Sequence, residues 1–311
     1  MRTFHRWSCL AIAIALCGGC GQAGPVRGTA PSSPTSRKQV LVTNYPLLYF
    51  AERIAGGSVD AVFPMTGDGD PAFWTPDAKT IARYQAADAI IINGATFEKW
   101  LMQATLPEAR IHDSSAKFAD KFIQVADAVT HSHGPEGEHS HAGTSFTTWI
   151  DFEQARQQAG AIAETLSQLV PERKADFEQN LAALVADLKV LDDQMQAIGK
   201  TLGDRPLVAS HPVYDYLARR YELQLKTVQW EPEEVPADHA IEELKKLLDG
   251  HVAKVMIWEG TPAPASVEKL KSLGLESIVF DPCGNRPKSG DWLTVMRANV
   301  DSLRTWANAN K

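Results

Sequence analysis

Residues 171–202 have the sequence PERKADFEQNLAALVADLKVLDDQMQAIGKTL, and this stretch decides the fold. Its apolar side chains recur at steps of three and four residues, at Phe177, Leu181, Leu184, Leu188, Leu191, Met195, Ile198 and Leu202. This spacing predicts one helix of about 30 residues, roughly 45 Å long, with a single apolar stripe. Pro171 suits the first helical position, and Gly203 suits the residue after the last turn.

Such a helix is longer than one small domain needs, and strand–helix patterns flank it on both sides. We therefore expect residues 171–203 to be a rigid backbone helix between an N-terminal lobe, 38–170, and a C-terminal lobe, 204–311. A stripe of this length could also pair with a copy of itself in a dimeric coiled coil. The flanking units need apolar faces to pack against, which favours the backbone helix and a monomer.

The first lobe alternates predicted strands and helices. Short apolar runs predict strands at 40–43, 59–63 and 89–92 and a helix at 47–55. Thr75-Pro76-Asp77 predicts the start of a second helix, with Thr75 as its cap. This alternation indicates a parallel sheet with right-handed crossovers.

Ligands of such sheets bind beyond the carboxyl ends of the strands. In the first lobe this edge carries Asn44-Tyr45, the loop 65–74 and Asn93-Gly94. Asp68 and Asp70 in the loop are oxygen donors that suit a metal, although aspartates also stabilise turns.

The second lobe repeats the pattern, with predicted strands at 206–210, 223–230, 254–258 and 277–280 and a last helix at 292–309. His211 directly follows the first of these strands, Glu259 the third and Asp281 the fourth. Because the strand ends meet at one edge of the sheet, these three side chains predict a shared metal site. The predicted class is thus α/β, with two lobes that each hold a parallel sheet flanked by helices, joined by one long rigid helix.

A histidine-rich tract occupies residues 131–141 and contains His131, His133, His139 and His141. Imidazoles at this density, interleaved with glutamates, attract zinc or copper weakly and in several geometries. The composition predicts a surface loop without packed structure. The alternative to metal binding is a solvated polar loop without a function. After it, Asp151 is predicted to cap a helix, with Gln154 completing a capping box.

The chain begins like an exported protein. Arg2 and Arg6 precede an apolar run, 7–16, that is too short to span a membrane and is typical of a secretory signal. Cys17-Gly18-Gly19-Cys20 is similar to a bacterial lipoprotein processing site, which predicts that residues 1–20 hold the signal and that Cys20 is lipidated. A plain signal peptide cut nearby is the alternative. Residues 21–37, rich in Gly, Pro, Ser and Thr, are expected to form a flexible tether.

Cysteine content and charge narrow the function classes. With Cys20 lipidated and the preceding residues removed, Cys283 is the one remaining thiol, so no intramolecular disulfide can form. We expect Cys283 to have a packing role. Loss of Arg2 and Arg6 takes the formal charge from −7 to −9. The sequence contains no basic stripe, which argues against nucleic-acid binding.

At this point the chain resembles the substrate-binding lipoproteins of zinc and manganese ABC importers, from about residue 38 to the C-terminus. The resemblance rests on the order of several motifs, namely Asp70-Pro71 through Trp74-Thr75-Pro76, the His-rich tract, Trp149-Ile150-Asp151, Ser210-His211, Tyr216-Leu217-Ala218-Arg219-Arg220-Tyr221, Glu259 and Asp281-Pro282. The His-rich tract of this chain is similar to the loop that marks the family's zinc-selective members.

Two first-lobe histidines expected from the resemblance are absent. Ala72 stands where a histidine usually follows Asp-Pro, and Thr147 stands where a second usually precedes the tryptophan. His211 and Asp281 match the second lobe's pair, and Asp68 or Asp70, or a loop histidine, could complete the shell. Trp74 could instead fill the space of the absent imidazole. That would indicate that the protein has evolved toward a weaker metal site or a different ligand. Glu259 could contact the metal or orient a ligand.

The resemblance implies a lipid-anchored, exported receptor that captures a divalent metal in the cleft between the lobes and delivers it to an ABC permease and its ATPase. Zn²⁺ is the expected metal and Mn²⁺ the less favoured one. No catalysis is implied. The alternatives are an exported metallohydrolase with Glu259 as general base, or a receptor-fold adhesin or scaffold that no longer binds metal tightly.

Overall fold

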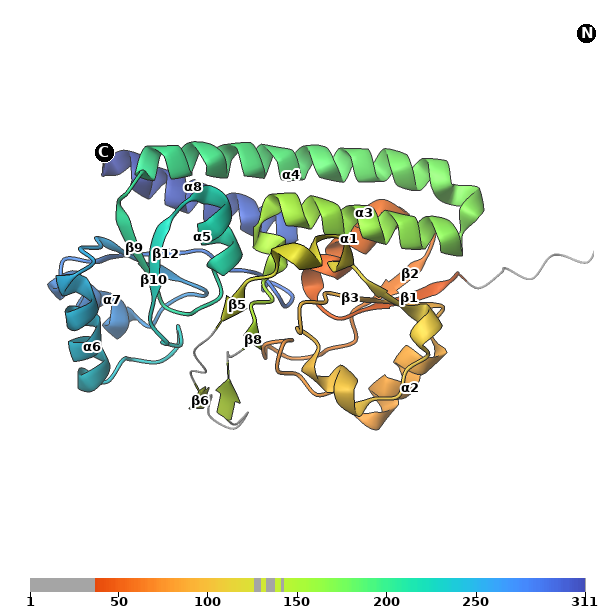
Figure 1. Ribbon diagram of the computed structural model, residues 1–311, viewed down its shortest axis with the longest axis horizontal. Helices are drawn as coiled ribbons and strands as arrows, with labels where there is room; N and C mark the ends of the chain where they lie inside the picture. The colour runs from red at the N-terminus through yellow and green to blue at the C-terminus, as the bar shows by residue number, and fades with distance from the viewer. Residues whose placement is uncertain (1–36, 126–129, 133–137, 141–142, 311) are drawn as a thin grey trace, which may run out of the picture. The chain divides into compact units, whose positions relative to one another are not determined.

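The computed structural model describes residues 37–125, 130–132, 138–140 and 143–310 (Figure 1). Two four-stranded parallel sheets organise these residues. The first has the order β2-β1-β3-β4, with strands Asp60–Val62, Gln39–Val42, Ala89–Ile92 and Ile111–Asp113. The second has the order β10-β9-β11-β12, with strands Gln224–Thr227, Pro206–Ala209, Val255–Trp258 and Glu276–Val279. The predicted fold class is confirmed, although β4, with one strongly apolar residue, was not predicted.

Helices connect and flank the strands of both sheets. The first lobe holds α1 (Tyr45–Ala55), α2 (Ala78–Ala86) and α3 (Phe152–Leu169). The second holds α5 (Asp215–Tyr221), α6 (Asp238–Asp249), α7 (Pro264–Ser272) and α8 (Trp292–Ala309). Short 3₁₀ turns add η1 (Lys99–Gln103), η2 (Glu108–Arg110), η3 (Ala116–Lys121), η5 (Thr148–Ile150) and η6 (Pro171–Arg173).

The long helix α4, Lys174–Leu202, has 29 residues and packs against α1 and α3 of the first lobe and α5 and α8 of the second (Figure 1). The predicted apolar stripe is buried throughout except at Leu181, which is partly buried. Because other helices of the same chain cover the stripe, it needs no second copy to bury it. The predicted start was three residues early, since η6 forms a 3₁₀ turn in which Arg173 N–H bonds to the Val170 carbonyl at 3.0 Å.

Two helix starts differ in detail from the prediction. The cap of α2 is Asp77, whose Oδ1 accepts the Thr80 N–H at 2.7 Å, and not Thr75. The carboxylate is the better acceptor and lies directly before the first turn. Asp151 caps α3 as predicted, accepting from the N–H groups of Glu153 and Gln154. The capping box was wrong, because the buried Gln154 amide makes no hydrogen bond.

Part of the His-rich tract forms regular structure, where a loop without it was predicted. Strand β6 (Thr130–Ser132) pairs antiparallel with β7 (Glu138–Ser140), and His131 lies opposite His139. A two-stranded pairing needs backbone hydrogen bonds and no apolar core, so the polar composition does not exclude it. A second pair joins β5 (Gln124–Val125) to β8 (Gly143–Thr144). His133, His141, the signal segment, Cys20 and residues 21–36 of the tether lie outside the described residues.

None of the helices in the described part of the chain combines the length and the apolar character that a membrane crossing requires.

Gly199 in α4 allows a close approach to α5. A Cβ added there would lie 2.3 Å from the Tyr221 carbonyl oxygen. We expect Gly199→Ala to lower the free energy of unfolding by about 2 kcal/mol, because the two helices must separate. Gly160→Ala in α3, where a Cβ meets nothing within 4 Å, should raise it by about 0.5–1 kcal/mol. Urea denaturation measures both, and a stabilised Gly199→Ala would contradict this account.

Candidate metal centre

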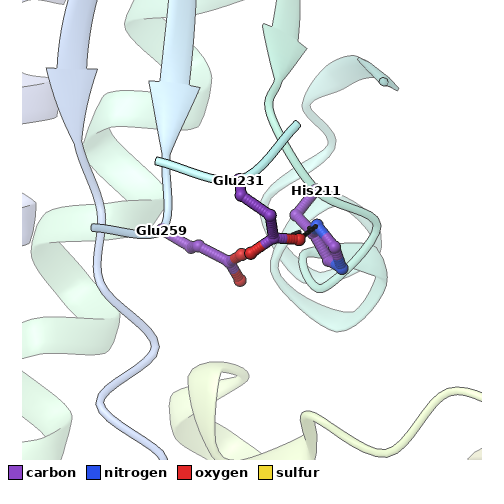
Figure 2. A group of neighbouring side chains, drawn as sticks. All are labelled: His211, Glu231 and Glu259. Carbon is purple, nitrogen blue, oxygen red and sulfur yellow. Dashed lines mark ion pairs between the residues drawn. The ribbon is translucent and has the colours of Figure 1, made fainter. Parts of the chain in front are cut away.

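A group of three metal-competent side chains lies beyond the strand ends of the second sheet: His211, Glu231 and Glu259. One ligand atom from each lies within 4.8 Å of the others. His211 Nδ1 is 3.5 Å from Glu231 Oε1 and 3.5 Å from Glu259 Oε1. Figure 2 shows both carboxylates directed toward the imidazole. This is the group that could hold a metal ion in the described part of the chain.

The fold brings these residues together because each follows a neighbouring strand. His211 comes after β9 and Glu259 directly follows the adjacent β11. Beyond β10 the chain stays beside β9, where the Trp230 N–H donates to the Ser210 carbonyl at 2.7 Å. This bond holds Glu231, the next residue, next to His211.

Glu231 was missing from the predicted site, although the sequence contained its signal. The second predicted strand of this lobe ends at residue 230, so Glu231 follows its strand as directly as His211, Glu259 and Asp281 follow theirs. The same strand-end reasoning would have found it.

Asp281 and Asp70, both predicted ligands, line the same cavity without belonging to the three-residue group. Asp281 Oδ1 accepts the Cys283 N–H at 2.6 Å. Asp70 Oδ1 accepts the Ala72 N–H at 2.8 Å, which is the turn chemistry expected of a loop aspartate. Asp68 also lines the cavity.

The cavity lies between the lobes and has a volume of about 520 Å³. From the second lobe it is lined by the three-residue group, Asp281 and Glu233. From the first lobe it is lined by aromatic rings and short polar side chains, among them Phe73, Phe97, Phe146, Thr147 and Trp149. Trp74, one alternative for filling the space of the absent imidazole, is not among the lining residues. It packs against Phe63, with ring centroids 6.5 Å apart.

Hydrogen bonds from the segment that follows β12 connect the first-lobe and second-lobe sides of the cavity. Asn285 Nδ2 donates to the Gly67 and Gly69 carbonyls at 3.0 and 2.8 Å, and Arg286 donates to the Met65 and Phe63 carbonyls at 3.0 and 2.6 Å. These bonds fasten the first-lobe loop that carries Asp70. In the same segment, the Pro282 carbonyl accepts a hydrogen bond from Trp149 Nε1 at 2.7 Å.

Burial, and after it the crowding of carboxylates, shifts the pKa values of the acidic groups in the cavity. Burial, with the charges of Glu233, Glu234 and Asp70, raises the pKa of Glu231 to about 7. Burial and then the charge of Glu231 raise the pKa of Glu259 well above its ordinary value. Burial also raises the pKa of Asp281 and of the Cys283 thiol. A bound divalent cation would offset this repulsion.

The buried carboxylate of Glu98 lies at the strand ends of the first lobe and organises its edge. It accepts hydrogen bonds from the Thr43 hydroxyl and from the Asn93 and Gly94 N–H groups, the last two at 2.6 and 3.2 Å. The Asn93 side chain in turn donates to the Phe146 carbonyl at 3.0 Å. Glu98 therefore supports the loop that presents Phe146 and Thr147 to the cavity.

Burial raises the pKa of Glu98 from 4.5 to about 7. The folded state thus holds this proton more tightly, so its stabilising contribution is complete below about pH 4.5 and is lost as the pH rises through about 7. Over the interval from 4.5 to about 7, at about 1.4 kcal/mol per pH unit, the loss is about 3–4 kcal/mol. The free energy of unfolding should fall less between pH 5 and pH 7.5 in Glu98→Gln than in the wild type, because glutamine does not titrate. Urea denaturation at both pH values tests this, with the exposed Glu108→Gln as control; parallel profiles for Glu98→Gln and wild type would contradict it.

Comparison with known proteins shows the family of this chain. Residues 40–306 match the family described as zinc-uptake complex component A, periplasmic (ZnuA). The chain is 27% identical to the high-affinity zinc uptake system protein ZnuA of Bacillus subtilis, with 97% of this chain and 98% of the relative covered. It is 24% identical to the zinc-binding lipoprotein AdcA of Streptococcus pneumoniae, covering 85% of this chain and 55% of that longer protein.

Solved structures share the fold. The metal-dependent lipoprotein YcdH of Bacillus subtilis superposes with a TM-score of 0.72 at 21% identity, covering 86% of this chain and 98% of that one. FpvC of Pseudomonas aeruginosa, solved with Mn²⁺, gives 0.69 at 19% identity, covering 89% and 100%. The resemblance expected from the sequence motifs is confirmed: this chain belongs to the zinc-uptake complex component A family.

Proposed function

We propose that this protein is the receptor of a metal importer, which captures a divalent cation, Zn²⁺ foremost, in the cavity between its lobes and delivers it to an ABC permease and its ATPase. The observation that carries the proposal is the convergence of His211, Glu231 and Glu259 beyond three neighbouring strands. Family membership supports it, and so do relatives named for zinc uptake and zinc binding.

The donor set suits a metal as cargo. One imidazole nitrogen and two carboxylates are ligands that Zn²⁺ and Mn²⁺ both accept. Asp70 and Asp281 line the same cavity and are candidates for a further oxygen ligand. His211 is 4% exposed, so a bound cation would be largely shielded from bulk water on that side.

We assign the protein no catalytic role, and we place it outside the cytoplasm, anchored by a lipid on Cys20 and acting as a monomer. The leader pattern of residues 1–20 supports export. Genes for a permease and an ATPase beside the gene for this chain would support transport over an adhesin or scaffold role.

Removal of any one ligand should weaken capture. We expect His211→Ala, Glu231→Gln and Glu259→Gln each to raise the Kd for Zn²⁺ by about 10- to 100-fold, because the remaining donors leave the ion incompletely coordinated. Isothermal titration calorimetry on metal-free protein measures this. Glu233→Gln, which removes the same charge from an exposed position at the cavity, is the matched control and should change Kd by less than about threefold. Equal losses in Glu233→Gln and Glu231→Gln would mean that Glu231 is not a ligand.

The His-rich tract and the cavity should bind metal separately. Deletion of residues 131–141, with His131, His133, His139 and His141, should remove weakly bound Zn²⁺ and leave one tightly bound ion per chain, because the proposed ligands lie elsewhere. Asp70→Ala and Asp281→Ala should each weaken that tight ion. Equilibrium dialysis with metal analysis gives the stoichiometries. Loss of the tight ion on deletion would show instead that a tract histidine completes the site.

A further inference from the structure

The residues that follow Asp281 bind along the first lobe. We call this stretch, residues 282–286, the crossing segment. Its Gly284 carbonyl accepts the N–H of Tyr45, the first residue of α1, at 2.9 Å. Together with the bond from Trp149 Nε1, this contact fixes the backbone of the crossing segment to the first lobe directly after a candidate metal ligand.

Asn285 joins the crossing segment to the loop that carries Asp70. Its Nδ2 donates to the Gly67 carbonyl at 3.0 Å and to the Gly69 carbonyl at 2.8 Å. Two hydrogen bonds from one planar amide restrict both the position and the orientation of the loop. Because Asp70 directly follows Gly69, a residue of the second lobe sets where its backbone lies.

Arg286 holds the start of the same loop. Two of its guanidinium nitrogens donate to the Met65 and Phe63 carbonyls at 3.0 and 2.6 Å, and the guanidinium lies over the Phe63 ring, 4.8 Å from the centroid. Hydrogen bonds from a charged, planar donor are stronger than those between neutral groups. With the amide of Asn285, this side chain therefore fixes the whole approach to Asp70.

Asp70 lies on the first-lobe wall of the cavity, and the three-residue group lies on the second-lobe wall. Its Oδ1 accepts the Ala72 N–H at 2.8 Å, and a carboxylate has two oxygens that accept several bonds, so this turn does not exhaust its capacity to bind a cation. Burial first, and then neighbouring charges that include Asp70, raise the pKa of both Glu231 and Glu259. The charge of Asp70 thus acts on the three-residue group across the cavity.

The bonds of the crossing segment are independent of the cargo. They join backbone groups, an indole, an amide and a guanidinium, and they use no atom of the imidazole or the carboxylates that would bind the ion. The two walls are therefore held in place before an ion arrives, and less conformational freedom is lost when it binds.

We propose that Asn285 and Arg286 are positioning residues of the metal site, which hold the Asp70 loop against the second lobe so that its carboxylate completes the coordination of an ion bound by the three-residue group. Neither side chain contacts the ion itself. This inference rests on the proposed metal-capturing function and adds the residues that set its affinity and its rate of release.

Asn285→Ala removes the positioning amide and leaves every proposed ligand in place. We expect it to raise the Kd for Zn²⁺ about tenfold, chiefly through faster dissociation, because loss of a group that orients a ligand typically weakens metal binding by about 10- to 100-fold. Calorimetry measures the Kd, and stopped-flow release to a chelator measures the dissociation rate.

A double-mutant cycle with Asp70→Ala shows whether the effect of Asn285 runs through Asp70. In the Asp70→Ala background, Asn285→Ala should change the Kd by less than about twofold, because the carboxylate that the amide positions is already gone. A tenfold loss in both backgrounds would overturn the inference, since Asn285 would then act on the cavity without Asp70.

Arg286→Met separates positioning from simple charge. Loss of a positive charge leaves the surroundings of the acidic cavity more negative, so charge alone predicts a lower Kd for Zn²⁺. Positioning predicts the opposite, a Kd about tenfold higher. Lys288→Met, which removes the same charge from an exposed position without altering the crossing segment, is the matched control and should not raise the Kd. A lowered or unchanged Kd in Arg286→Met would contradict the positioning role.

Hydrogen exchange gives a second readout that does not depend on metal. Amides of residues 63–70 should exchange faster in Asn285→Ala than in the wild type, while those of α4 keep their rates. Variants that bind and release Zn²⁺ as the wild type does would overturn the inference and leave the proposed function intact. Wild-type protein that binds no Zn²⁺ would overturn the proposed function.

Discussion

The structure depends on one apolar core that both lobes share. Trp292, at the start of α8 in the second lobe, packs edge-on against Phe50 of α1 at 5.0 Å between ring centroids and lies 5.8 Å from Tyr49 and 6.4 Å from Phe152. Burial of a tryptophan removes about 200 Å² from water, which contributes about 5 kcal/mol. Ion pairs from Asp187 of α4 to Arg53 and Arg297 also join the lobes, but partly exposed pairs contribute only about 0–1 kcal/mol each. The core, and not the ion pairs, thus fixes the arrangement of the lobes.

A shared core restricts how this receptor can hold and release its cargo. Separation of the lobes would expose Trp292 and the stripe of α4 to water, so a wide hinge motion is unfavourable. The hydrogen bonds from Asn285 and Arg286 to the loop of residues 63–70 add local restraint at the mouth of the cavity. Small shifts of loops at the strand ends are therefore the available route for entry and release.

Periodicity predicted most of the fold, because burial of an apolar stripe leaves a strong pattern in the sequence. It gave strand 89–92 and helix 292–309 with their observed bounds, and it placed α4 between the lobes. Features that depend on single side-chain contacts were less predictable. The Asp77 cap replaced Thr75, and Gln154 lies buried without the capping-box bond. Thr75 and Asp77 are both favoured cap residues, and only the position of the first turn decides between them.

The site could be predicted in part, because the predicted strands already fix which residues lie at the edge of the sheet. Topology alone brings residues after neighbouring strands together, which is why His211 and Glu259 were found and why Glu231 could have been. Absent ligands are a different matter. Ala72 and Thr147 show only that two imidazoles are missing, and the sequence gives no measure of the space they leave. In the structure, the rings of Phe73 and Phe146 line the first-lobe side of the cavity. The three-residue group lies on the second lobe and Asp70 on the first, so a cation bound between them would contact donors from both walls of the cavity.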